Sequence, residues 1–293
     1  MNPDHAASPS SAHGADPQFK LNQELRTRER IGSAGQAERY IHRLIRKHFP
    51  GRPASSIRVL DVGTGQGFAV KALRSLGYDA WGLEPGGRLD EAEPAVRPFI
   101  HTVYSQDLLI QHPDIERFDF IFSSGVVEHV GTSDGNSALV ENYREYRKVF
   151  MDSQLALLRA GGILLVSGPN RLFPFDFQHG DHYYHGILKM FDHLPILKHA
   201  TLPWHPRNHL VSCRDLQRIV AALPYEVEFI HESQADYSSM TKIRNHPLIR
   251  VLFRAYIGTV SVLPFFVRQF VETHTVFICR LIRPRDRAAA ATA

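Results

Sequence analysis

Short apolar runs alternate with stretches of helical periodicity along the first half of the chain. Apolar residues recur every three or four positions in segments that we expect to be helices, at residues 34–48, 68–75 and 137–158. Short continuous apolar runs predict buried strands at residues 57–62, 80–83, 99–103, 118–123 and 163–167. Strands that alternate with helices in this way form a parallel sheet with helices on both faces. The pattern therefore predicts an α/β fold with a doubly wound, Rossmann-like sheet.

The same pattern predicts how the rest of the chain is organised. Residues 1–17 contain no apolar run, so we expect a disordered tail there, followed by an N-terminal helical cap over residues 18–56. The core is expected at residues 57–240, including a histidine-rich and aromatic insertion at 169–210, a helix at 214–222 and a strand at 226–231. After the core we expect a basic, apolar helical segment at 241–273, a last strand at 274–287 and a frayed end at 288–293.

A glycine-rich turn follows the first predicted strand. Gly63, Gly65 and Gly67 stand two apart between that strand and the next helix. Glycines let the backbone approach a ligand closely, and the first amides of the helix have no partner within the helix, so the turn predicts a nucleotide-like ligand. A nicotinamide fingerprint would require glycine or alanine at the position of Phe68, which argues against a dinucleotide site.

Together with Asp61, this turn resembles the signature of class I S-adenosylmethionine-dependent methyltransferases, in the group that contains quinone and small-molecule methyltransferases. Further segments agree in order: Glu84 ends the second strand, a Ser-Gln-Asp-Leu segment follows the third, and residues 118–130 resemble the fourth-strand motif with its trailing Glu-His pair. The resemblance implies S-adenosylmethionine as cofactor. It also implies a seven-stranded sheet, mostly parallel, with an antiparallel last strand.

The resemblance also implies which residues hold the cofactor. Glu84 matches the acidic residue whose two oxygens accept hydrogen bonds from the ribose hydroxyls, and Asp107 is placed like the residue that holds the adenine amino group. Asp61 has an alternative role, which is to organise the amides of its own turn. The cofactor-binding set implied in this way is Asp61, Gly63, Gly65, Gly67, Glu84, Asp107, Leu108 and Ser124.

The catalytic residue expected from the sequence is His129. Methyl transfer from a sulfonium mainly requires an aligned acceptor atom and the exclusion of water, and a base is needed only for acceptors such as a hydroxyl. His129 follows the fourth strand, at the edge where doubly wound sheets bind ligands. A purely structural role for the Glu-His pair is the alternative.

Histidines are concentrated in the insertion that follows the fifth strand. Seven of the 17 histidines fall between residues 179 and 209, among many aromatic residues. Polar groups between aromatic walls are typical of a pocket for a partly apolar acceptor, and the predicted acceptor-binding residues are Asn170, His179, His182 and His209. The alternatives are a packed loop that covers the sheet and a metal site. The histidine spacing fits no defined ligand pattern, so no metal is predicted.

Charge is distributed unevenly along the chain. The formal net charge is +4, but residues 241–287 hold nine basic and two acidic residues, which gives this region +7 and leaves −3 for the remainder. The basic residues alternate with apolar ones, which is typical of a helix that lies on an anionic membrane surface. An ordinary helical cover on the sheet is the alternative. No RNA-binding motif is present, and we expect no nucleic acid partner.

These observations predict an enzyme that transfers a methyl group from S-adenosylmethionine to an oxygen atom of a small or lipid-like acceptor. The alternatives are a non-catalytic S-adenosylmethionine-binding module and a nicotinamide-dependent oxidoreductase. No apolar stretch approaches the roughly 20 residues that span a bilayer, and the first residues lack the order of a secretory signal. We therefore expect a cytoplasmic protein that reaches a membrane only as a peripheral partner.

Overall fold

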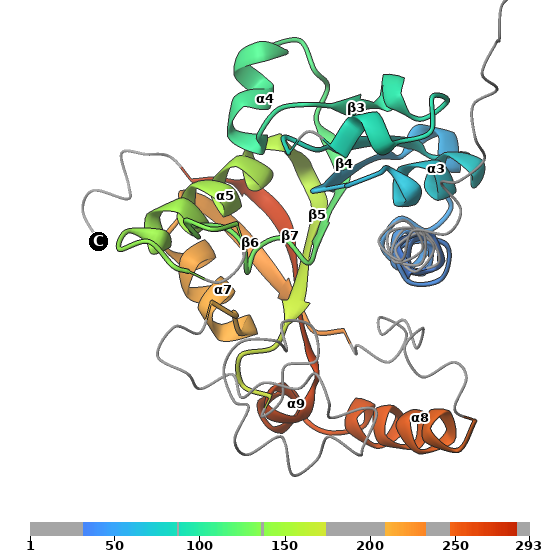
Figure 1. The fold of residues 1–293 in the computed structure, drawn as a ribbon, viewed down its shortest axis with the longest axis vertical. Coiled ribbons are helices and arrows are strands. Elements are labelled where there is room, and N and C mark those ends of the chain that lie inside the picture. Colours follow the sequence, from blue (N-terminus) through green and yellow to red (C-terminus); the bar gives the residue numbers. More distant parts are fainter. Residues whose placement is uncertain (1–31, 87, 136–137, 174–208, 233–246, 286–293) are drawn as a thin grey trace, which may run out of the picture.

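Seven strands form one twisted sheet in the order β3-β2-β1-β4-β5-β7-β6 (Figure 1). The computed structural model describes residues 32–86, 88–135, 138–173, 209–232 and 247–285. The strands are β1 Arg58–Val62, β2 Asp79–Leu83, β3 Ile100–His101, β4 Phe118–Ser124, β5 Leu158–Pro169, β6 Tyr225–Ile230 and β7 His274–Pro284. β7 pairs antiparallel with β5 and β6, whereas the other pairs are parallel. This topology confirms the predicted Rossmann-like sheet with an antiparallel last strand.

Helices cover both faces of this sheet. Those on the faces are α2 His42–His48, α3 Phe68–Ser75, α4 Ser105–Gln111, α5 Tyr143–Leu157 and α7 Cys213–Ala221, whereas α8 Pro247–Ser261 and α9 Phe265–Val271 lie beyond the tip of β5 (Figure 1). A π-helical turn, Ala37–Ile41, leads into α2, and short 3₁₀ turns lie at Ala54–Ser56, Arg88–Glu91 and Arg97–Phe99. Among the described residues, no helix is long and apolar enough to cross a membrane.

The central strands are largely apolar because both of their faces are buried, and Asp61 in β1 and Asp119 in β4 are the charged exceptions at buried positions. Val59 and Leu60 are neighbours in β1 and point in opposite directions, so they belong to different apolar clusters. Val59 packs in the cluster with α2 and α3, and Leu60 packs in the cluster with α5 and α7. Figure 1 shows α3 on one side of the sheet and α5 and α7 on the other.

Several boundaries differ from the sequence prediction. α5 begins at Tyr143 instead of residue 137, because Gly131 adopts a φ of 80° and the loop behind it closes through a Thr132–Leu139 bridge. β5 begins at Leu158 and runs through the glycine pair at 161–162, where glycines would ordinarily end a helix. The third strand has only two residues, and α4, which the sequence analysis missed, follows it closely. The expected tail at 1–17 and frayed end at 288–293 lie outside the described residues.

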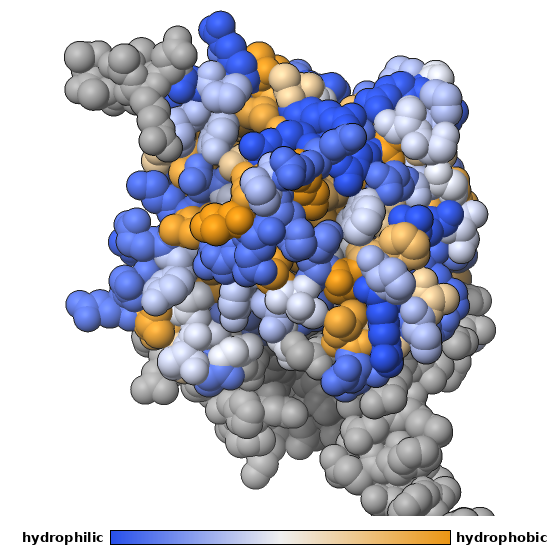
Figure 2. Space-filling view, turned by 90° about the horizontal axis from the view of Figure 1, so that it is seen from above, coloured by the Kyte–Doolittle hydropathy of each residue, from blue (hydrophilic) through white to orange (hydrophobic). Residues whose placement is uncertain are grey.

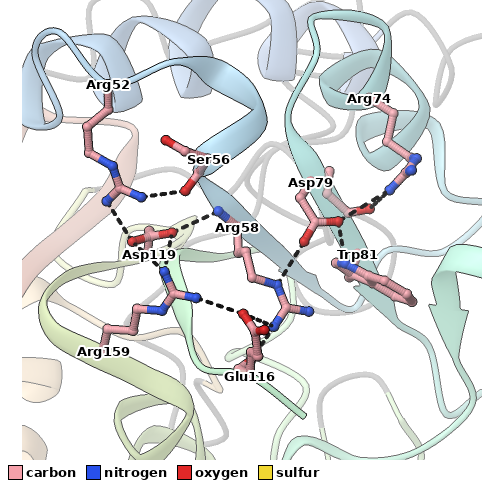
Figure 3. A network of polar contacts seen from close by, with 10 residues as sticks. Arg52, Ser56, Arg58, Arg74, Asp79, Trp81, Glu116, Asp119 and Arg159 are labelled. Atoms are coloured by element: carbon pink, nitrogen blue, oxygen red, sulfur yellow. Dashed lines mark hydrogen bonds and ion pairs between the residues drawn. The ribbon is translucent and has the colours of Figure 1, made fainter.

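A network of charged residues ties the amino ends of the central strands together (Figure 3). Asp119 in β4 is 4% exposed and accepts hydrogen bonds from Arg52 Nη1 at 2.7 Å and from the backbone amide of Arg58 at 2.8 Å. Arg159 in β5 lies 3.3 Å from the same carboxylate. Arg58 also donates to Asp79 in β2 at 2.8 Å. The network therefore joins β1, β2, β4 and β5 at one edge of the sheet.

Asp119→Ala should lower the free energy of unfolding by about 2–3 kcal/mol, because the buried Arg58 amide and two guanidinium groups lose their acceptor. Urea denaturation would measure this loss. Asp119→Asn, which retains one acceptor oxygen, should cost less. If Asp119→Ala unfolded at the same urea concentration as the parent protein, the network would have no stabilising role.

Candidate functional site

The glycine-rich turn has the backbone conformation that its sequence predicts. Gly63, Gly65 and Gly67 have φ angles of 79°, 57° and 76°, in the left-handed region that favours glycine. A Cβ atom on Gly63 would lie 2.3 Å from Cγ2 of Val126, in the loop after β4. A Cβ atom on Gly67 would lie 2.7 Å from Cδ1 of Ile100 in β3. The turn therefore lies in close contact with both the β4 loop and β3.

Two carboxylates are buried beside this turn. Asp61 near the end of β1 is 6% exposed, and Glu84, which follows β2, is 9% exposed. Oε2 of Glu84 accepts a hydrogen bond from the amide of Gly65 at 2.8 Å, and Oε1 accepts one from the amide of Gly86 at 3.1 Å. These two amides fix the orientation of the Glu84 carboxylate. Each of its oxygens still has a lone pair for another donor, such as a ribose hydroxyl.

The electrostatics of the site favour a positively charged ligand. Burial raises the pKa of Asp61 to about 7, the nearby side chain of Thr64 opposes this effect, and the charge of Glu84 adds to it. A cation placed next to the two carboxylates would stabilise their ionised forms. S-adenosylmethionine combines a ribose with a sulfonium cation, so the residues of this site fit it.

The other residues of the predicted cofactor set lie on segments that follow the ends of neighbouring strands. Asp107 is partly exposed in the first turn of α4, which begins shortly after β3, and Leu108 is buried beneath it. Ser124 ends β4, and its hydroxyl lies 3.2 Å from that of Ser167 in β5. In a parallel sheet these strand ends share one edge, so the fold brings the predicted set to the same edge as the glycine turn.

His129 lies in the loop after β4 and is close to His209, one of the residues predicted to bind the acceptor. Their rings stack with centroids 6.3 Å apart and an interplanar angle of 27°. Because Val126 of the same loop contacts Gly63, this loop connects the histidine pair with the glycine turn. The roles of His129 and His209 in catalysis and acceptor binding stay predictions.

Arg147 in α5 binds the backbone next to His129 and the backbone of His209. The sequence did not indicate this role. Its buried guanidinium donates to the carbonyl oxygens of Val130 at 3.2 Å, of Glu128 at 3.4 Å and of His209. Burial lowers the pKa of Arg147, and the negative charge of Glu128 is among the effects that oppose this shift. Arg147 is a positioning residue, because it acts through the carbonyl groups of the two residues that flank His129 and through that of His209.

Asn170 has a structural role at the end of β5. Its side-chain amide nitrogen donates to the carbonyl oxygens of Gln269 at 2.7 Å and Glu272 at 2.8 Å. Its oxygen accepts from the amide of Leu172, and the Thr275 hydroxyl, whose single proton has a shorter acceptor in the carbonyl of Val211 at 2.9 Å, lies 3.3 Å away. Both hydrogens of the Asn170 amide are therefore used within the fold, and neither is left to donate to an acceptor molecule.

Two of the predicted acceptor residues, His179 and His182, lie outside the described residues. Within the described ranges, no group of three or more histidine, cysteine, aspartate or glutamate side chains is arranged to hold a metal ion. Both cysteines, Cys213 and Cys279, are buried and free, and burial raises the pKa of each thiol to about 12. They are therefore core residues rather than nucleophiles.

The fold and this edge of the sheet define a class I methyltransferase architecture. A family model described as a methyltransferase domain matches residues 33–228, so the chain belongs to that family and its cofactor is S-adenosylmethionine. This confirms the resemblance that the glycine turn and the strand-end motifs indicated.

Sequence similarity to individual curated proteins covers less of the chain than the family match does. The mitochondrial ubiquinone biosynthesis O-methyltransferase of Mus musculus is 26% identical over 132 residues, which cover 42% of this chain and 32% of that protein. The Bos taurus protein of the same name is 32% identical over 98 residues, which cover 30% of this chain and 26% of that protein. The match thus spans about a third or less of these relatives. A SAM-dependent methyltransferase structure from Archaeoglobus fulgidus has a TM-score of 0.44 at 17% identity, covering 90% of this chain and 100% of that one.

Gly65→Asp should weaken S-adenosylmethionine binding by at least about a hundredfold, because it places a third carboxylate against the buried Glu84. Isothermal titration calorimetry would measure the affinity. Gly51→Asp is a matched control, since Gly51 also has a positive φ, of 77°, but open space around its Cβ position. If Gly65→Asp stayed folded and bound the cofactor as the parent does, the turn would not be the binding site.

The affinity for S-adenosylmethionine should rise as the pH increases from 6 to 8. With a pKa of about 7, Asp61 is mostly protonated at pH 6 and mostly ionised at pH 8, and only the ionised form attracts a cation. Binding should be about five- to tenfold weaker at pH 6 and should release a proton there. Titrations in buffers of different ionisation enthalpy would detect that proton. Asp61→Asn should abolish this component of the pH dependence, and an unchanged pH profile in that variant would exclude Asp61 as its source.

Proposed function

We propose that the protein transfers a methyl group from S-adenosylmethionine to an oxygen atom of a small or lipid-like acceptor. The observation that supports this best is the contact between Gly63 and Val126, which connects two parts of the site. On one side of it lie the buried carboxylates Asp61 and Glu84, and on the other lies the loop with His129. A cofactor held by the carboxylates would thus have a histidine on the neighbouring loop.

The chemistry requires little covalent participation by the protein. S-adenosylmethionine supplies a methyl group that is already activated by its sulfonium. The bond between this methyl group and sulfur breaks as the bond to the acceptor oxygen forms, and S-adenosylhomocysteine is the second product. His129 accepts the proton of the acceptor hydroxyl. Arg147 keeps the backbone on both sides of the histidine pair in place, so that the base and the acceptor stay aligned.

The choice of oxygen and of a lipid-like acceptor has support from the relatives. The mouse and cattle proteins are named ubiquinone biosynthesis O-methyltransferases, and the mouse match covers 42% of this chain. A half-buried imidazole also suits a hydroxyl acceptor, because an oxygen nucleophile must lose a proton during the reaction.

Incubation of the full chain with S-adenosylmethionine that carries a labelled methyl group, together with a lipid and metabolite extract, would test this proposal. We expect label in an organic-soluble product whose methyl group is bound to oxygen. Label on nitrogen or carbon would contradict the proposed acceptor atom. Cofactor binding without any labelled product would favour a non-catalytic binding module.

With the acceptor in hand, His129→Gln should lower kcat by about 100- to 1,000-fold and leave the affinity for S-adenosylmethionine unchanged. His112→Gln, at an exposed histidine after α4, is the matched control and should keep the parent kcat. In His129→Gln, the dependence of kcat on pH should also lose the limb that reports the ionisation of an imidazole. A His129→Gln enzyme with the parent kcat would rule out His129 as the base.

A further inference from the structure

Helix α8 has two separate apolar faces. One face packs inward through Ile257 and Val260, which are each 4% exposed. The other consists of Leu248, Val251 and Leu252, which are 59–70% exposed, and Val262, which directly follows the helix, is 80% exposed. At 100° per residue the three helical side chains fall within an arc of roughly 100°, and the centre of the inward face lies roughly 160° away from the centre of this arc. We call Leu248, Val251 and Leu252 the outer stripe. Within the described part of the chain, the outer stripe is not used for packing.

Helix α9 extends this exposed apolar surface. Phe266 and Phe270 stand one helical turn apart and are 66% and 47% exposed. An ordinary helical cover would direct such side chains toward the sheet. Figure 2 shows the opposite end of the molecule, where hydrophilic residues dominate and apolar ones are scattered between them. The surface of α8 and α9 is therefore more apolar than the face of the protein that Figure 2 shows.

The charged residues in α8 and in the stretch just before it are all positive. From residue 242 to residue 267 the chain contains four basic residues and no acidic one, and the next basic residue, Arg268, is buried against Glu272. Arg254 in α8 is exposed and lies at the border of the outer stripe, next to Val251 on the helical wheel. Apolar side chains bordered by basic ones are typical of helices that lie in the interface of an anionic membrane. A second copy of this chain would present the same positive charge, so the charge favours a lipid surface over self-association.

The segment is anchored firmly at the carboxyl edge of the sheet. β7 begins at His274, three residues after α9, and pairs there with Pro169 at the end of β5. The Asn170 amide binds two carbonyl groups near the end of α9, and Arg268 forms a buried ion pair with Glu272 at 3.1 Å. Figure 1 shows α8 and α9 beyond the tip of β5. Because β5 pairs parallel with β4, its tip belongs to the same edge of the sheet as the ends of the other parallel strands.

We propose that α8 and α9 dock on an anionic membrane surface, with the outer stripe and the two phenylalanines among the lipid chains and Arg254 at the headgroups. The docking itself does not depend on methyl transfer. Its purpose rests on the proposed function, because docking at this end turns the carboxyl edge of the sheet, with the cofactor site, toward acceptors dissolved in the membrane.

Vesicle flotation of the full chain tests the docking. We expect the protein to float with vesicles of phosphatidylcholine that contain about one third phosphatidylglycerol, to stay behind with phosphatidylcholine alone, and to dissociate at high salt. Replacing Leu248, Val251 and Leu252 together with serine should weaken partitioning at least about a hundredfold. Arg254→Gln should weaken it about fivefold. Val149→Ser, at an exposed apolar residue of α5, is the matched control and should float like the parent.

Three outcomes would overturn the proposal. They are no flotation of the parent protein, equal flotation with and without the anionic lipid, and undiminished flotation of the triple serine variant. A concentration-dependent dimer that the triple variant abolishes, seen by analytical ultracentrifugation without vesicle binding, would identify the outer stripe as a contact between copies and would also overturn it. Titration of S-adenosylmethionine into each variant separates this question from the proposed function, because the outer stripe is not part of the cofactor site.

Discussion

The burial of two carboxylates at one edge of the sheet is the constraint on which the rest of the site depends. Asp61 and Glu84 lie at the ends of adjacent parallel strands, where the backbone pairing of β1 with β2 brings them together. Buried like charges are unfavourable without compensation. The amides of Gly65 and Gly86 provide part of it for Glu84, and a cationic ligand would provide the rest. The site is thus prepared electrostatically for a sulfonium.

The same requirement explains the close packing around the turn. The amide of Gly65 can reach Glu84 only because the turn follows left-handed backbone angles, and that path brings Gly63 against Val126. The loop after β4 is held in turn by Arg147, which binds its carbonyl groups and that of His209. A chain of direct contacts therefore runs from the cofactor turn to the histidine pair.

The fold was predictable from the sequence where local signals were strong. The buried strands β1 and β4 appear as short, largely apolar runs, and the glycine spacing marks the turn that holds Gly63, Gly65 and Gly67 at left-handed angles. β3 was less predictable, since only two residues pair there. α5 starts later than its periodicity suggests, because Gly131 and the bridge behind it close a loop first.

The site was predictable only in part, because some roles depend on contacts between distant segments. Asn170 is a polar residue next to an aromatic-rich segment, as is typical of a pocket. Its amide nevertheless binds backbone carbonyl groups about 100 residues further along the chain. Arg147 was missed because an arginine within a helix is usually exposed, and only the packing of α5 shows that it is buried. The outer stripe of α8 was foreseen as an apolar and basic pattern, whereas its separation from the packed face required the structure.

The central claim is that the carboxyl edge of this sheet binds S-adenosylmethionine through Asp61, Glu84 and the glycine turn. A structure of the full chain in complex with S-adenosylhomocysteine tests it most directly. We predict the ribose hydroxyls within hydrogen-bonding distance of the Glu84 carboxylate and the sulfur on the side of the loop that contains His129. A complex in which the ribose lies away from Glu84, or in which the ligand binds at another edge of the sheet, would contradict the claim.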